Sequence, residues 1–147
     1  MTQTFHQPAT ESPDASDLRP FTDDGLPRTL WWDATVGVLR LIDQTLLPDR
    51  CEVLTCADAK CVAEAIRALR VRGAPAIGVA AAYGLALGVR SALIIAPPEP
   101  DAALARITAS ANLLRATRPT AINLAWALDR MLAVARAHLA AHGDIST

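Results

Sequence analysis

An almost uninterrupted apolar run, from Ala74 to Val89, constrains the fold of this chain more than any other feature. Wound as a helix it is apolar nearly all round, so it predicts a buried central helix over about Pro75 to Leu93. The run is shorter than the ~20 residues that a membrane-spanning helix needs. Arg90 also ends it, so we expect a core helix and no membrane partner.

Three further stretches have apolar residues at helical spacing, so each could form a helix that packs one apolar face against the central helix. They cover residues 57–70, 101–117 and 120–142, and Gly143 is a suitable terminator for the last one. Gly84 and Gly88 form a GxxxG pair, which in an alanine-rich helix permits close packing of a neighbouring helix. The sequence thus predicts a bundle of four helices.

Short extended segments precede these helices. Leu30 to Ile42 predicts a hairpin with its turn at Val36-Gly37, and Cys51 to Thr55 predicts a third strand with Glu52 facing out. Strands followed by helices are the α+β order. We therefore predict a small antiparallel β-sheet followed by a four-helix bundle.

The two ends of the chain differ in composition from the rest. Residues 1–28 carry four prolines among Ser, Thr and Asp, which predicts a disordered N-terminal extension. Residues 29–142 should form the β/helical-bundle domain, and residues 143–147 a truncated linker. The polar N-terminus has no apolar stretch of a signal peptide, which favours a cytoplasmic location.

Charge and metal-ligating residues exclude several classes of function. A net charge of -1 argues against nucleic acid as a partner, because such proteins carry a basic excess. Cys51, Cys56 and Cys61 form no CxxC pair and lie far from the histidines, so we expect reduced thiols rather than a zinc site. His138 and His142 lie one helical turn apart, but no third ligand accompanies them. We expect no metal and no cofactor.

The segment VRGAPAIG, from Val71 to Gly78, has the composition of an anion site at a helix start. Gly73 permits a tight turn and close approach of a ligand, and Pro75 suits the first helical position. Backbone N–H groups around Gly73 and Ala74, together with the helix dipole, would face a phosphate, and Arg72 could add a bidentate contact. Taken alone, the segment is equally compatible with a plain helix–helix turn.

A second segment, TRPTAINL from Thr117 to Leu124, repeats the combination of an arginine and a proline before a long helix. Arg118 and Arg72 could therefore converge on one anion, although the alternative is a turn with Thr120 as the helix cap. This repetition favours the anion site.

Other conspicuous residues have structural explanations. Asp33 and Asp43 are expected to cap turns, and the tryptophans, including Trp126, to serve in packing. Asp129 and Arg130 could form a local ion pair or a dimer contact. We find no credible pair of nucleophile and base.

Four segments together carry a family resemblance. Trp32, LIDQT (Leu41 to Thr45) with Leu47-Pro48, the run VRGAPAIGVAAAYGLALG, and RPTAINLAWALDRM from Arg118 to Met131 resemble methylthioribose-1-phosphate isomerases. The wider group includes ribose-1,5-bisphosphate isomerases and the regulatory subunits of eukaryotic initiation factor two-B. The resemblance runs in order from about residue 30 to residue 140.

The resemblance implies an aldose–ketose isomerase of methionine salvage, which converts 5-methylthioribose 1-phosphate to 5-methylthioribulose 1-phosphate. It implies that Arg72, Gly73, Ala74 and Arg118 contact the sugar phosphate, and that the full-length enzyme is a cytoplasmic homodimer. The alternatives are a ribose-1,5-bisphosphate isomerase and a non-catalytic assembly module like the initiation-factor subunits.

The chain departs from the family in its length. Family members carry a second, Rossmann-like domain that supplies the catalytic Cys and Asp, and this domain is absent from these 147 residues. None of the three cysteines lies in the motif of the nucleophile. We therefore expect no catalytic residue within this chain, which should be inactive alone as a fragment of the isomerase.

Overall fold

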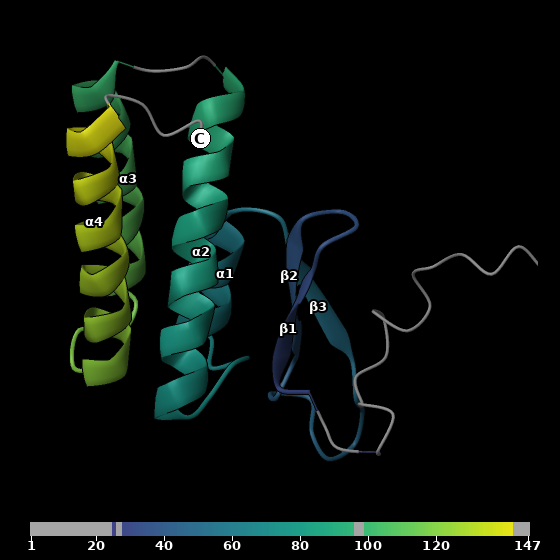
Figure 1. Ribbon diagram of the computed structural model, residues 1–147. Coiled ribbons are helices and arrows are strands. Elements are labelled where there is room, and N and C mark those ends of the chain that lie inside the picture. Colours follow the sequence, from purple (N-terminus) through teal and green to yellow (C-terminus); the bar gives the residue numbers. More distant parts are fainter. Residues whose placement is uncertain (1–24, 26–27, 96–98, 143–147) are drawn as a thin grey trace, which may run out of the picture.

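A three-stranded antiparallel sheet lies beside four helices in the computed structural model of the chain (Figure 1). The structure describes residues 25, 28–95 and 99–142. This architecture confirms the predicted fold class. The predictions for residues 1–28 and 143–147, including Gly143 as a terminator, fall almost entirely outside the described residues.

The sheet has the strand order β1-β2-β3, with β1 at Leu30–Asp33, β2 at Val38–Ile42 and β3 at Val53–Cys56. The predicted hairpin is confirmed, and its turn includes Gly37 with a φ of +67°. The third strand begins two residues later than predicted, so Glu52 is exposed but precedes the strand.

Arg40 joins the three strands across one face of the sheet. Its Nε donates to Oδ2 of the buried Asp33 at 2.8 Å, and its Nη1 donates to Oγ1 of Thr55 at 3.0 Å. The hydrogen bond from Arg40 holds the pKa of Asp33 below its ordinary value, although burial acts in the opposite direction.

The helices are α1 at Ala59–Arg67, α2 at Ala74–Ile95, α3 at Pro100–Arg115 and α4 at Ile122–His142. The prediction for α1 was too long at both ends. Asp58 caps it by accepting from the Cys61 N–H at 2.8 Å. Leu69, with a φ of +62°, lies beyond its C-terminal end and is exposed, although the predicted helix over residues 57–70 included it.

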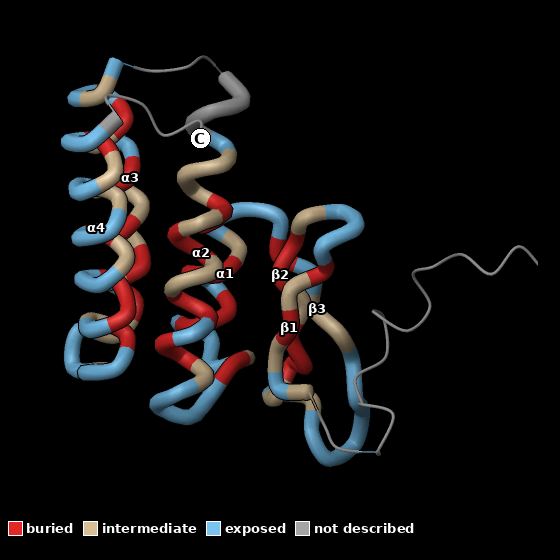
Figure 2. The backbone as a smooth tube through the Cα atoms, viewed as in Figure 1, coloured by how far each residue is buried: buried red, intermediate tan, exposed pale blue. Residues whose placement is uncertain are grey.

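Helix α2 is central, since α1, α3, α4 and the sheet all contact it. Trp32 of β1 stacks on Tyr83 of α2, with ring centroids 5.4 Å apart. Of the stretch Ala74–Ser91, however, 39% is buried, so this central helix is less buried than predicted (Figure 2). By length and composition this is the one helix among the described residues that could cross a membrane, a test that core helices of soluble proteins also pass.

The GxxxG pair of α2 is a packing device, as predicted. A Cβ at Gly84 would lie 2.9 Å from Cγ1 of Val62 and 3.0 Å from Cδ2 of Leu114. A Cβ at Gly88 would lie 2.6 Å from Oγ of Ser110. Both glycines therefore let α1 and α3 approach the α2 backbone closely.

Cys56 and Cys61 form a disulfide, with Cα atoms 5.3 Å apart, so the prediction of reduced thiols was wrong for this pair. The last residue of β3 and the first turn of α1 lie next to each other because only a short bend separates them. Cys51 is exposed and unpaired within the described part of the chain.

Candidate anion-binding site

The start of α2 is open to solvent at the three positions predicted to meet a phosphate. Arg72, Gly73 and Ala74 are all exposed. Gly73 has a φ of +93°, and no heavy atom lies within 4 Å of the place that a Cβ would occupy. Its carbonyl accepts from the Ile77 N–H at 2.9 Å, which makes Gly73 the cap of α2 and Pro75 the second helical residue rather than the first.

Arg72 keeps most of its hydrogen-bonding capacity for a ligand. The Arg72 Nε donates to the Leu69 carbonyl at 3.0 Å. Among the described residues this is the one hydrogen bond of its guanidinium, so both Nη groups remain for other partners. A guanidinium held at one edge can present the other edge to phosphate oxygens.

The second segment folds differently from the prediction. The Arg118 carbonyl accepts from the Ala121 N–H at 3.0 Å, which closes a turn that contains Pro119 and Thr120. Helix α4 begins only at Ile122, so Thr120 is not its cap. Arg118 itself is half-buried, directly before this turn.

The structure brings the two segments to the same end of the molecule. Helices α2 and α4 run in the same direction, with their N-terminal ends together (Figure 1). A Cβ at Gly78 would lie 2.9 Å from the Asn123 carbonyl oxygen, so the first turns of the two helices touch. Arg72 and Arg118 share no bond within the described residues, but both flank helix starts at this end.

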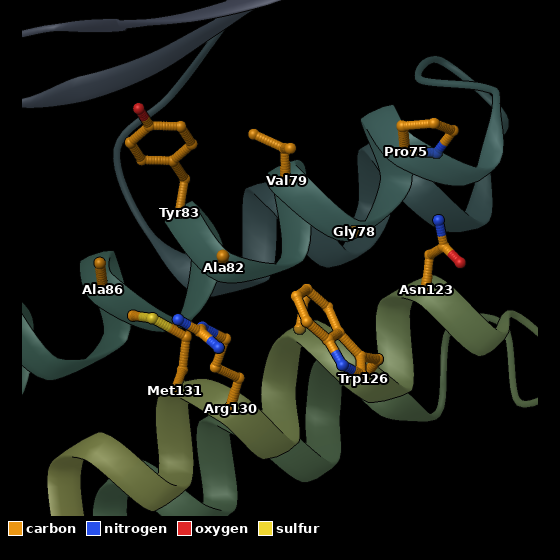
Figure 3. A pocket seen from close by; sticks show the side chains of 11 residues that line it. Pro75, Gly78, Val79, Ala82, Tyr83, Ala86, Asn123, Trp126, Arg130 and Met131 are labelled. Carbon is orange, nitrogen blue, oxygen red and sulfur yellow. The ribbon is translucent and has the colours of Figure 1, made fainter.

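An apolar groove of about 560 Å³ runs between α2 and α4 away from these helix starts (Figure 3). Trp126 lines this groove and is 64% exposed, so it is not the packing residue that was predicted. The Arg130 guanidinium carbon lies 5.7 Å from the Trp126 ring centroid, within cation–π range. The groove is lined by Pro75, Gly78, Val79, Ala82, Tyr83, Ala86, Asn123, Trp126, Ala127, Arg130 and Met131.

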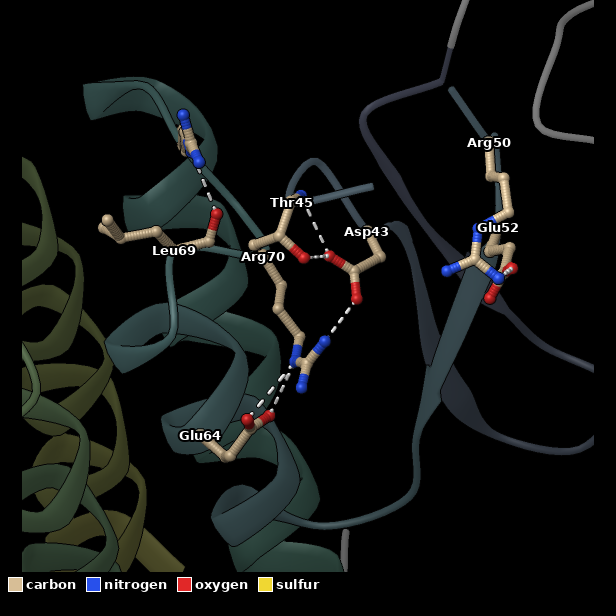
Figure 4. A network of polar contacts seen from close by, with 8 residues as sticks. Asp43, Thr45, Arg50, Glu52, Glu64, Leu69 and Arg70 are labelled. Atoms are coloured by element: carbon tan, nitrogen blue, oxygen red, sulfur yellow. Dashed lines mark hydrogen bonds and ion pairs between the residues drawn. The ribbon is translucent and has the colours of Figure 1, made fainter. Parts of the chain in front are cut away.

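A network of polar contacts behind the α1–α2 loop was missed by the sequence analysis (Figure 4). Asp43, 5% exposed, accepts from the Thr45 N–H at 3.0 Å and from Thr45 Oγ1 at 2.6 Å, which confirms it as a turn cap. Its other oxygen pairs with Arg70, which also binds Glu64. Asp43 and Arg70 are 27 positions apart in the sequence, so no local signal indicated this pairing.

The network sets the ionisation of its buried carboxyl. Burial raises the pKa of Asp43, but hydrogen bonds from Thr45 and Arg70 outweigh burial and hold that pKa below its ordinary value. Asp43 is therefore an anion at neutral pH, paired inside the protein.

Other candidate groups make structural contacts. Asp129 pairs with Arg115 of α3 at 2.5 Å rather than with Arg130, its neighbour in sequence. No group of three or more His, Cys, Asp or Glu side chains suited to a metal ion occurs among residues 25, 28–95 and 99–142.

A family model and curated relatives both match this chain. Residues 70–146 match the model of the Initiation factor 2 subunit family. Methylthioribose-1-phosphate isomerase of Herpetosiphon aurantiacus is 49% identical over 111 residues, covering 76% of this chain and 30% of that protein. The isomerase of Syntrophotalea carbinolica is 54% identical over 100 residues, covering 68% and 28%. The chain thus spans less than a third of the length of these curated relatives.

Two solved structures share the fold. The 5-methylthioribose 1-phosphate isomerase from Pyrococcus horikoshii has a TM-score of 0.67 at 36% identity, covering 80% of this chain and 31% of that one. The translation initiation factor eIF-2B, subunit delta, from A. fulgidus has a TM-score of 0.64 at 40% identity, covering 72% and 29%. The matched sequence and the shared fold show that the chain belongs to the Initiation factor 2 subunit family.

Proposed function

We propose that this chain is the amino-terminal, substrate-binding part of an aldose–ketose isomerase that converts 5-methylthioribose 1-phosphate to 5-methylthioribulose 1-phosphate in methionine salvage. One observation carries the proposal: two helix starts, each flanked by an arginine, lie together at one end of the bundle. The identity of about half of the aligned residues to isomerases of this name supports it.

The phosphate of the substrate would lie at the N-terminus of α2. Unpaired backbone N–H groups and the positive end of the helix dipole favour an anion there. Gly73 leaves the approach open because no side chain projects from it, and Arg72 adds a charged hydrogen-bond donor. Arg118 would approach from the start of α4.

The groove beside these helix starts favours one sugar phosphate over another. Its lining is almost wholly apolar, and Arg130 lies against Trp126 at its edge. An apolar methylthio end would be accommodated there at low cost, whereas a second phosphate would lose hydration against a mostly apolar lining whose one charged donor is Arg130. The groove therefore supports 5-methylthioribose 1-phosphate rather than ribose 1,5-bisphosphate.

In this proposal the chain binds and orients the sugar, and the rest of a longer protein performs the proton transfer. Aldose–ketose isomerisation moves a proton between two neighbouring carbons, which needs a positioned acid and base. Curated relatives are about three times as long as the matched segment. We propose that the full-length protein is a cytoplasmic homodimer.

A non-catalytic assembly module is the second candidate. The 40% identity to the delta subunit of an initiation factor favours it. In that case the helix starts would be ordinary turns, and sugar phosphate would not bind to them.

Calorimetric titration of the 147-residue chain tests the proposal. We expect 5-methylthioribose 1-phosphate to bind, and Arg72→Ala and Arg118→Ala each to weaken binding about tenfold, since each removes a charged hydrogen bond of ~1.5 kcal/mol. Arg136→Ala is the matched control, because Arg136 is exposed on α4 far from the helix start.

The outcomes separate the candidates. Binding that Arg72→Ala weakens and Arg136→Ala leaves unchanged supports the isomerase. Equal affinity for ribose 1,5-bisphosphate would overturn the assignment of the sugar. No heat of binding from the folded chain with either sugar would favour the assembly module.

A further inference from the structure

We propose that Arg70 is a positioning residue of the anion site: held between Asp43 and Glu64, it fixes the loop that presents Arg72 and Gly73. The inference concerns the site of the proposed function and rests on it for its ligand. It adds a residue that does not itself touch the sugar phosphate.

The side chain of Arg70 bridges two elements. Its Nη1 pairs with Oδ2 of Asp43, which directly follows β2. Its Nε donates to Oε1 and Oε2 of Glu64 in α1, at 3.2 and 3.1 Å (Figure 4). The guanidinium thereby ties the C-terminal part of α1 to the end of a strand.

The backbone of Arg70 is anchored at the same place. Its N–H donates to the Ala65 carbonyl at 2.9 Å, and its carbonyl accepts from the Gln44 N–H at 2.9 Å. The next residue, Val71, is fully buried. Arg72 follows immediately, so its Cα position depends on these fixed neighbours.

The loop needs such anchoring because its conformation is uncommon. Leu69 has a φ of +62°, a region that costs a non-glycine residue energy, and Gly73 has a φ of +93°. The Arg72 Nε bonds to the carbonyl of Leu69 itself, so it contacts the residue with the uncommon conformation. A loop held in one conformation binds more tightly than one that must be ordered by its ligand.

The two arginines therefore have separate roles. The charge of Arg70 is balanced by two carboxylates, one of them buried, so it is committed inside the protein. Arg72 is exposed and has no ion pair within the described residues. Arg70 positions the loop, and Arg72 meets the anion.

Arg40 supplies a matched control for a purely structural role. It also bridges a buried aspartate to a second element, because it joins Asp33 to Thr55. Its contacts lie within the sheet and involve no residue of the α1–α2 loop. Arg40→Ala should therefore destabilise the fold without changing the anion site.

The experiment measures Arg70→Ala and Arg40→Ala by two methods, below the melting temperature of each. Amide hydrogen exchange reports the order of residues 69–74 without ligand, and calorimetry reports the affinity for 5-methylthioribose 1-phosphate. In Arg70→Ala we expect faster exchange in this loop and affinity about tenfold weaker, as when the competent conformation falls to a tenth of the population. Arg40→Ala should change neither.

Each result decides something different. Unchanged loop exchange in Arg70→Ala overturns the positioning role, whatever the ligand does. Faster exchange with unchanged affinity also overturns it, because the loop order would then not serve binding. If the parent chain binds no sugar phosphate, the proposed function fails, whereas the exchange measurement still decides whether Arg70 orders the loop. Faster loop exchange together with weaker affinity in Arg70→Ala, and neither change in Arg40→Ala, supports both proposals.

Discussion

Asp33 and Asp43 are buried carboxylates at two ends of the sheet, and both are satisfied by the same kinds of partner. Each caps a turn with one oxygen and receives an arginine on the other. The caps were predictable because they bond to residues two positions along the chain. The arginines were not, since residues seven and 27 positions away are brought close only by strand pairing and by the packing of the α1–α2 loop.

These two carboxylates should make stability depend on acid pH. The pKa values of both groups are lowered in the folded chain. For Asp33 the main cause is the hydrogen bond from Arg40. For Asp43 the hydrogen bonds from Thr45 and Arg70 together outweigh the opposite effect of burial. Their contribution is therefore complete above the unfolded pKa of about 3.9 and is lost as pH falls through the lower folded values. Urea unfolding at a series of pH values should show the free energy of unfolding decrease below about pH 4.

Replacement of one carboxylate tests the origin of this effect. Asp43→Asn should be less stable than the parent at neutral pH, with a shallower loss of stability in acid. The exposed Asp49→Asn serves as the control and should follow the parent curve. Identical acid profiles of Asp43→Asn and the parent would contradict the assignment.

At the scale of elements, α2 shows what periodicity can and cannot predict. Its position as the central helix follows from its apolar composition. The groove beside it could not be predicted in this way, because apolar side chains that line a groove cannot be distinguished in the sequence from those that face the core. Gly78 lets α2 and α4 touch at their starts, and the groove lies between the two helices beyond this contact, where alanines such as Ala82 and Ala86 form part of its lining.

The close contact at Gly78 can be tested by adding a methyl group. In Gly78→Ala the Cβ would meet the Asn123 carbonyl at 2.9 Å, and a backbone atom cannot move aside cheaply. We expect Gly78→Ala to lower the free energy of unfolding by about 1–3 kcal/mol, despite the higher helix propensity of alanine.

Val79→Ala is the neighbouring control for this change. Val79 is 44% exposed, and its truncation should cost about 0.5 kcal/mol or less. Thermal and urea unfolding of the two variants would give the comparison. A Gly78→Ala variant as stable as the parent would show that α4 can shift away without loss.

At the scale of the whole molecule, sheet and bundle share one core. Leu39 and Leu41 of β2 belong to the same buried cluster as Ile66 of α1, Leu85 of α2 and Leu114 of α3. The Trp32–Tyr83 stack and the Arg70 network add links between the two parts. We therefore expect one cooperative unfolding transition.

A single variant makes this cooperativity measurable. The chain has three tryptophans, and Trp126→Phe leaves only Trp31 and Trp32, both in β1. Fluorescence then reports the sheet, while far-ultraviolet circular dichroism reports the helices. The two unfolding curves should coincide in Trp126→Phe, and separate midpoints would show that the sheet and the bundle unfold independently.

The sequence by itself determined the fold class, the order of the elements, and the place near Gly73 and Pro75 where α2 begins. These depend on local rules: apolar periodicity, turn residues, and a glycine and a proline at a helix terminus. The helix ends were predicted less well, because Leu69 and the turn after Arg118 adopt conformations that tertiary contacts impose. The tertiary structure alone decided that the starts of α2 and α4 meet, that a groove opens beside them, and that Arg70 anchors their loop. Each of these depends on residues distant in sequence, whose proximity is set by packing of the whole chain.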